Sequence, residues 1–354
     1  MKEIVKSKKL VFFPPGADLC YSPVTAYLFG VLQPHITTNK NLLFWLISNF
    51  MNPCIDINLR ANGVKELLIY EEFFRQDLWY SCPFILSLNL KPDLINGLKN
   101  MSFIEFVKEA IDLDYFVYAD INKHYIPNYK TEEDWQHNML ILGYDKIKGE
   151  LDVADYFRQG RFSLEKCGEN NVNMAFQMMK KVDDCDKFNT INLFRYQEVN
   201  NYKFNLGEIK EKLKDYLNAT NLIVKNYYAY FAFEFKNSGE LYYGIQFYDA
   251  LIQLVINNRD LSVKSFHLLV MHKKIMKLRL EILKKYGVQI ENLYKINEDL
   301  INETIILRNL IIKESIKRTN NSRLENSDKQ KLIDELKKLK ENDVLFTEKL
   351  ISFL

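Results

Sequence analysis

The chain has 354 residues, and 47% apolar with 27% charged side chains is the balance of a folded, soluble protein with one large domain or two ordinary ones. Because the chain has 48 basic and 46 acidic side chains, its overall charge favours neither nucleic acid nor an anionic membrane as a partner. The longest apolar run, 42–51, is about half of what crosses a bilayer, and 10–13 is too short for the core of a signal peptide. We therefore expect a cytoplasmic protein without a membrane span.

The first two hundred residues alternate between two kinds of periodicity. Helical spacing of apolar residues marks 22–33, 40–50 and 102–112, whereas runs rich in β-branched and aromatic residues mark 83–90, 114–122, 137–145 and 150–157. Turn formers such as Gly143 and Gly149 separate the last strands, which is typical of an antiparallel meander. This half predicts a first domain over 1–204 that contains an antiparallel sheet.

From about residue 205 onward the strand pattern gives way to apolar residues at three- and four-residue steps. Long stretches of this kind are typical of packed helices, and a polar turn at 320–330 precedes the last one. The sequence therefore predicts an α+β protein: the sheet-containing domain, followed by an α-helical bundle over 205–354.

Cys20 stands where a coil containing Pro and Gly gives way to the first predicted helix. A helix N-terminus favours the thiolate, so Cys20 is a candidate nucleophile. The alternative is a buried cysteine that only fills space beside an apolar helix. The other cysteines, Cys54, Cys82, Cys167 and Cys185, lack such a position, and the irregular spacing of all five predicts neither disulfides nor a metal site.

His137 opens the strand 137–145, and Asp155 lies on the strand that returns beside it after the turn at 145–149. A histidine and an acid on neighbouring strands can form the base and orienting acid that a thiol nucleophile needs. Asp152 and Asp145 are competing acids. The alternative is a histidine that is merely hydrogen-bonded at a strand end.

Several segments carry a resemblance: "YFVYAD", "HYIPNY", "HNMLILGYD" and "LDVADYF", with "YYGIQFYDAL" and "HKKIMKLRLEIL" in the helical half. Together they resemble papain-fold cysteine enzymes, and more narrowly the family of butirosin biosynthesis protein H, an NlpC-like branch that transfers acyl groups during antibiotic assembly. The resemblance spans nearly the whole chain. It implies a papain-like catalytic domain with Cys20 as nucleophile, His137 as base and Asp155 as orienting acid.

The function implied is amide formation in secondary-metabolite biosynthesis, including polythioamide-type pathways. Cys20 would accept an acyl group from the phosphopantetheine thioester of an acyl or peptidyl carrier protein and pass it to a small amine. No cofactor of the enzyme's own and no metal are expected, since the histidines lack zinc spacing and no glycine-rich phosphate loop occurs. A papain-like peptidase or amidase, and a catalytically silent binding protein of the same fold, remain open, as does the oligomeric state.

Two weaker patterns bear on partners. The segment 272–285 offers six cations that could dock an acidic carrier protein, although a solvated helix face would look the same. The six are Lys273, Lys274, Lys277, Arg279, Lys284 and Lys285. Tyrosines in 226–230 and 242–243 could line an acyl tunnel or form the bundle core.

Overall fold

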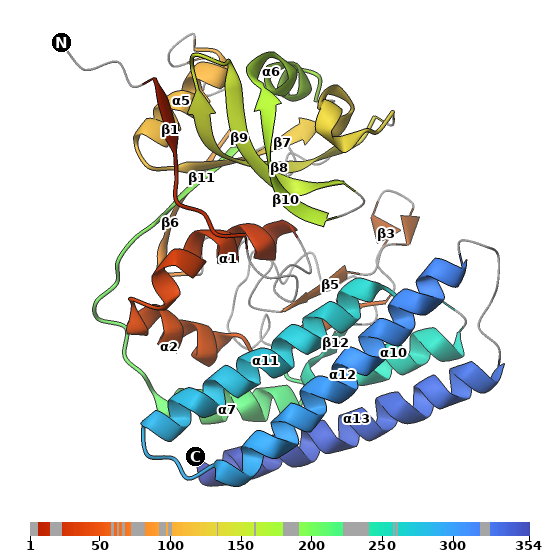
Figure 1. Ribbon diagram of the computed structural model, residues 1–354. Helices are drawn as coiled ribbons and strands as arrows, with labels where there is room; N and C mark the ends of the chain where they lie inside the picture. The colour runs from red at the N-terminus through yellow and green to blue at the C-terminus, as the bar shows by residue number, and fades with distance from the viewer. Residues whose placement is uncertain are drawn as a thin grey trace. The chain divides into compact units, whose positions relative to one another are not determined.

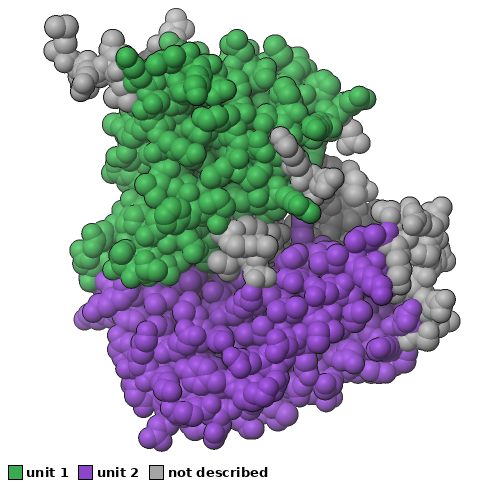
Figure 2. All heavy atoms as spheres, viewed as in Figure 1, with its two compact units in different colours: residues 1–39, 76–200 green, residues 40–75, 201–354 purple. Residues whose placement is uncertain are grey.

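The computed structural model divides the chain into two compact units, residues 1–39 with 76–200 and residues 40–75 with 201–354 (Figure 2). It describes residues 6–14, 23–57, 60–61, 64–65, 68–71, 82–91, 97, 101–132, 134–158, 161–179, 191–221, 241–257, 259, 261–318 and 326–354. The change of unit between residues 200 and 201 lies close to the boundary expected at 204/205. Residues 40–75, in contrast, belong to the unit that holds the C-terminal helices.

The first unit is built on a seven-stranded antiparallel sheet with the strand order β10-β9-β8-β7-β11-β6, and β1 pairs with β8 (Figure 1). The strands are β1 (Ser7–Lys9), β6 (Ile85–Leu90), β7 (Phe116–Asn122), β8 (Gln136–Asp145), β9 (Glu150–Arg158), β10 (Arg161–Gly168) and β11 (Ile191–Tyr196). The expected antiparallel sheet is confirmed, and so is the α+β class. The runs at 83–90, 114–122, 137–145 and 150–157 correspond to β6, β7, β8 and β9.

The turn between β8 and β9 is set by local chemistry. The Asp145 carboxylate accepts hydrogen bonds from the backbone N–H groups of Ile147 and Lys148, at 3.0 and 3.1 Å. Gly149 has φ +63°, a left-handed conformation that costs glycine least. This turn lets the chain return directly, so that Asp145 faces Glu150 across the two strands.

Three helices, α1 (Pro23–Ile36), α5 (Phe103–Asp112) and α6 (Glu169–Gln177), pack on the sheet. In the view of Figure 1, α1 lies on the opposite side of the strands from α5 and α6. The Tyr27 ring of α1 packs edge-on against Tyr118 of β7, with centroids 5.6 Å apart. The start of α5 is fixed by a capping box between Ser102 and Glu105. Short 3-10 turns, η2 (Lys123–Tyr125) and η3 (Pro127–Tyr129), join β7 to β8.

The second unit combines helices with small sheets. Its helices are α2 (Lys40–Asn49), α7 (Leu206–Leu217), α10 (Phe247–Ile256), α11 (Val263–Lys285), α12 (Glu291–Arg318) and α13 (Asn326–Phe353). Its strands are β2 (Pro53–Asp56), β5 (Leu68–Glu71) and β12 (Leu241–Tyr243) in one sheet, and β3 (Arg60–Ala61) with β4 (Val64–Lys65) in another, with a 3-10 turn η4 (Gly244–Gln246) after β12. The helices expected beyond residue 205 are confirmed. The strand β12 was not expected, because a three-residue strand has no pattern of its own and exists here by pairing with the distant β2.

Side chains from α11 explain why α2 belongs to the second unit. Arg279 donates from Nε to the Ile47 carbonyl at 2.7 Å and from a terminal nitrogen to the Phe50 carbonyl at 2.9 Å. His272 Nε2 lies 2.9 Å from the Met51 carbonyl. The last carbonyls of a helix need such partners, so these contacts attach the end of α2 to the bundle.

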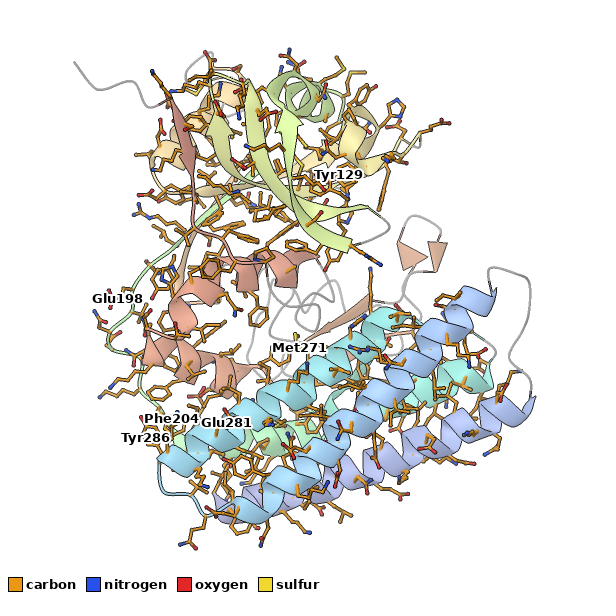
Figure 3. The ribbon with its side chains drawn as sticks, in the orientation of Figure 1. Tyr129, Glu198, Phe204, Met271, Glu281 and Tyr286 are labelled. Carbon is orange, nitrogen blue, oxygen red and sulfur yellow. The ribbon has the colours of Figure 1, made fainter. Side chains whose placement is uncertain are left out.

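In the same unit, an aromatic cluster packs near the end of α11. The Phe204 ring lies 4.9 Å from Phe44 and 4.5 Å from Tyr286, and Figure 3 shows the labelled Phe204 and Tyr286 together.

Within the described ranges, no helix is both long and apolar enough to cross a membrane.

Candidate functional site

His137 lies on β8, where it pairs with Ile121 of β7. Its Nδ1 is 3.2 Å from the carbonyl oxygen of Asn138, and its ring centroid is 5.3 Å from that of the half-exposed Trp135. Because a carbonyl can only accept, a hydrogen bond here places a proton on Nδ1, and in the neutral ring the lone pair is then on Nε2. A neutral imidazole in this tautomer is in the state that a general base needs.

Asp155 lies on β9, just beyond the last residue pair of the β8–β9 ladder, Leu140 with Ala154. Its side chain is fully buried. One carboxylate oxygen, Oδ2, accepts a hydrogen bond from the Tyr129 hydroxyl at 2.5 Å and lies 2.9 Å from Lys123 Nζ. The sequence prediction that His137 and Asp155 occupy neighbouring antiparallel strands is therefore met by β8 and β9.

The carboxylate contacts of Asp155 nevertheless go to Lys123 and Tyr129, and His137 is not among the partners that the structure gives it. Its second oxygen, Oδ1, makes no short hydrogen bond in the described part of the chain, although the Tyr27 hydroxyl interacts with this carboxylate.

Tyr27 links the first helix to this carboxylate. Burial, followed by the nearby charge of Asp155, raises the pKa of the Tyr27 hydroxyl well above its ordinary value. The Tyr27 hydroxyl also acts as a donor toward the Asp155 carboxylate, although neither it nor Asp155 Oδ1 makes a short, well-aligned hydrogen bond in the described part of the chain. The second turn of α1 thus lies beside Asp155, and α1 begins three residues after Cys20 in the sequence.

Lys123 is buried between two aromatic rings. Its Nζ lies 4.4 Å from the centroid of Tyr129 and 4.5 Å from that of Trp135. Burial lowers the pKa of Lys123, while its ion pair with Asp155 opposes this shift. Sequence reasoning missed Lys123 and Tyr129. Both stand in the segment "KHYIPNY", which directly follows a buried strand, and that position was the available signal.

The competing acids have partners elsewhere. Asp152 lies 3.2 Å from Lys9 Nζ and 3.3 Å from Lys166 Nζ, while Asp145 serves the turn after β8. Of the three acids, Asp155 is the one that is fully buried and next to α1.

Cys20 lies outside the described residues, and so does Cys185, so the triad of Cys20, His137 and Asp155 stays a prediction. The side chains of Cys54, Cys82 and Cys167 are buried. Burial raises the pKa of Cys82, and it raises the pKa of Cys167 to about 12. A thiol with so high a pKa is not a nucleophile near neutral pH.

The structure does not place all six cations of the possible carrier-docking segment 272–285 at the surface. Lys273 and Arg279 are fully buried, because α11 packs on several sides within its unit. Lys277 lies 2.9 Å from Glu298, and Lys284 lies 3.5 Å from Glu291. The expectation of a surface position is therefore wrong for Lys273 and Arg279, while Lys277 and Lys284 form ion pairs with residues of α12.

The tyrosines in 226–230 lie outside the described residues, whereas Tyr243 is buried in its unit. Among the described side chains, no group of three or more His, Cys, Asp or Glu residues is arranged to hold a metal ion.

Comparison with known proteins adds no family: no protein-family model matches the chain, and no curated protein sequence matches it.

Proposed function

We propose that the protein is a cysteine-dependent acyltransferase with a papain-like catalytic domain, forming an amide in secondary-metabolite biosynthesis. Cys20 is the nucleophile, His137 the general base, and the acyl donor is a thioester on a carrier protein. The acceptor is a small amine. The observation that carries the proposal is the meeting of α1, which begins just after Cys20, with the buried Asp155 on the strand next to that of His137.

The chemistry follows from the His137 tautomer. Nε2 takes the Cys20 thiol proton as the sulfur attacks the thioester carbonyl, and the carrier thiolate leaves with a proton from the imidazolium. The acyl–cysteine then meets the amine, whose proton passes to Nε2 as nitrogen attacks. Collapse of that intermediate releases the amide and returns the Cys20 thiol, so atoms and protons balance over the two steps.

Two arrangements can orient the His137 ring for proton transfer. One is the contact of Nδ1 with the Asn138 carbonyl, and the other is a turn of the ring toward Asp155. Asp155→Asn distinguishes them. If Asp155 orients the base, acylation should slow by orders of magnitude. If Asp155 serves Lys123 and Tyr129, the variant should lose stability while folded protein keeps its acylation rate.

The proposal is tested with acyl thioesters of N-acetylcysteamine, which mimic the end of the phosphopantetheine arm. Mass spectrometry should show an acyl adduct on Cys20, and added amines should discharge it as amide faster than water does. Cys20→Ala and His137→Ala should abolish or strongly slow adduct formation. Cys167→Ala is the matched control, since this buried thiol should carry no adduct.

Each other outcome has a defined meaning. Discharge by water as fast as by every amine tested would replace the transferase with a peptidase or amidase. Absence of an adduct with acyl thioesters of different chain length and ring content would overturn the proposal in favour of a binding protein of the same fold.

A further inference from the structure

A cavity of about 620 Å³ opens in the first unit between the η3 turn and strands β9 and β10. This volume is within the range of small-molecule sites. Seven residues line the cavity: Asn128, Tyr129, Lys130, Phe157, Arg161, Ser163 and Glu165. They join two aromatic rings with three charged side chains, a combination suited to an amphipathic ligand.

A β-bulge places one of these rings. Arg161 pairs with Arg158 while the next residue, Phe162, pairs with Tyr156, so Phe157 is the extra residue without a partner across the ladder. Bulges turn a side chain away from its regular direction and occur often beside binding sites. Here the bulged residue, Phe157, is one of the two aromatic residues of the cavity.

The second ring is held in place before any ligand arrives. Tyr129, labelled in Figure 3, packs against Phe157 with centroids 4.7 Å apart, and its hydroxyl donates to Asp155. Lys123 Nζ lies over the Tyr129 ring. Because contacts on several sides fix this ring, a ligand that packs on it need not order it, which favours affinity.

The charges of the cavity favour an anion. Arg161 and Lys130 both have exposed side chains, and in the described part of the chain neither makes an ion pair or side-chain hydrogen bond. Lys130 has φ +53°, in the left-handed region that lysine seldom occupies. Glu165 is the opposing charge, and Ser163 Oγ lies 3.5 Å from its carboxylate.

We propose that this cavity binds a small carboxylate that carries an aromatic ring. The ring packs on Phe157 and Tyr129, and the carboxylate is held by the Arg161 guanidinium with help from Lys130. A guanidinium fork matches a carboxylate in shape and charge. Glu165 faces the same space, so it disfavours ligands with more than one negative charge.

Isothermal titration calorimetry of the full chain with three probes tests the proposal. 3-Phenylpropanoate carries both features, its primary amide keeps the ring without the charge, and butanoate keeps the charge without the ring. We expect 3-phenylpropanoate to bind roughly 10-fold or more tightly than either, since the amide loses the charge-assisted hydrogen bond to Arg161 and butanoate loses the packing on the two rings.

Variants assign the charge. Arg161→Gln should weaken binding of 3-phenylpropanoate by roughly 10-fold and leave the amide unchanged, while Glu165→Gln should strengthen binding of the anion. Lys148→Gln is the matched control, since Lys148 is an exposed cation in the β8–β9 turn that does not line the cavity, and it should change nothing. Equal binding of acid and amide, an unaltered affinity in Arg161→Gln, or no binding of any probe would overturn the proposal.

The same titrations on Cys20→Ala separate this site from the proposed acyl transfer. Binding should persist in that variant, because the contacts that the proposal uses come from Phe157, Tyr129 and Arg161. Loss of acylation with intact binding would count against the enzyme alone, and loss of binding with intact acylation would count against the cavity alone.

Discussion

The two units contain the same buried arrangement in different surroundings. In the first, Asp155 Oδ2 meets Lys123 and the Tyr129 hydroxyl. In the second, Asp343 Oδ2 meets Lys273 and the hydroxyls of Tyr216 and Tyr248, at 2.5 and 3.0 Å for the tyrosines. The other carboxylate oxygen of Asp343 has no hydrogen-bond partner among the described residues, whereas the Asp155 carboxylate also interacts with the Tyr27 hydroxyl.

The surroundings differ in access. Lys273, Asp343, Tyr216 and Tyr248 are all fully buried, and His272 accepts from Lys273 at 3.1 Å on the inner side. The first arrangement reaches the surface instead: Trp135, which is 51% exposed, covers Lys123, and Tyr129 lines the cavity. The same chemical groups thus stabilise the packing of helices in the second unit, whereas in the first unit they lie beside a candidate site.

The largest expected effect comes from breaking the enclosed pair. Lys273→Met leaves the Asp343 carboxylate in the bundle without its cation, and the free energy of unfolding should fall by about 3–5 kcal/mol. Urea unfolding followed by circular dichroism measures this. The double variant Lys273→Met with Asp343→Leu should recover most of the loss, because no unpaired charge remains. A single variant as stable as the parent would contradict the enclosed pair.

The corresponding change in the first unit should cost less. Lys123→Met leaves Asp155 beneath a half-exposed ring that water can approach, and we expect a loss of about 2–3 kcal/mol. This variant should also weaken binding of 3-phenylpropanoate, because Tyr129 loses the cation that holds its ring. Lys273→Met should leave that binding unchanged in folded protein. Equal effects of both variants on binding would remove the distinction between the two arrangements.

Acid should affect the second arrangement through its histidine. Burial, followed by the charges of Lys273 and Arg279, lowers the pKa of His272 well below its ordinary value of 6.5. As pH falls below 6.5, the unfolded chain therefore binds a proton that the folded chain does not. The free energy of unfolding should then fall by up to about 1.4 kcal/mol per pH unit until the folded pKa is reached.

His272→Gln should remove that slope, since glutamine can still donate to the Met51 carbonyl without taking up a proton. His124→Gln, at an exposed position of the first unit, should leave the slope in place. Urea unfolding at pH 7.0, 6.0 and 5.0 gives the comparison. A slope that survives in His272→Gln would assign the acid sensitivity to another group.

The smallest effect compares single hydroxyl groups. Tyr216→Phe removes one of two tyrosine donors from Asp343, which keeps Lys273 and Tyr248, and should cost about 1 kcal/mol. Tyr129→Phe removes the tyrosine donor to Asp155 Oδ2, which then keeps only Lys123, and should cost more, about 2 kcal/mol. Thermal unfolding of the two variants tests this order. If Tyr216→Phe cost more than Tyr129→Phe, Asp155 would have more hydrogen-bond donors than its described contacts indicate.

Local patterns in the sequence predicted much of the frame of the candidate site. Alternating β-branched and aromatic residues marked β7, β8 and β9, and the turn chemistry at Asp145 and Gly149 predicted that β8 and β9 run antiparallel. The placement of His137 and Asp155 on neighbouring strands followed from this alone. These features depend on residues close together in the chain, so a single sequence contains the information.

The partners of buried charges could not be read in the same way. Lys123 and Asp155 are far apart in sequence, as are Lys273 and Asp343, and nothing in the local pattern tells a paired lysine from a solvated one. For that reason the sequence places Lys273 and Arg279 on a helix surface, either a docking face or a solvated one, although both are buried. A charge enters a protein interior only with a partner, and folding of distant segments decides which partner it meets.

The sequence by itself thus determined the α+β class, the antiparallel strands, the C-terminal helices and the pairing of β8 with β9, because periodicity and turn residues act over short distances. The tertiary structure decided that residues 40–75 join the C-terminal helices, that Asp155 meets Lys123, and that the bulge at Phe157 lines a cavity. Each of these depends on contacts between remote segments, which become defined only when the chain has packed.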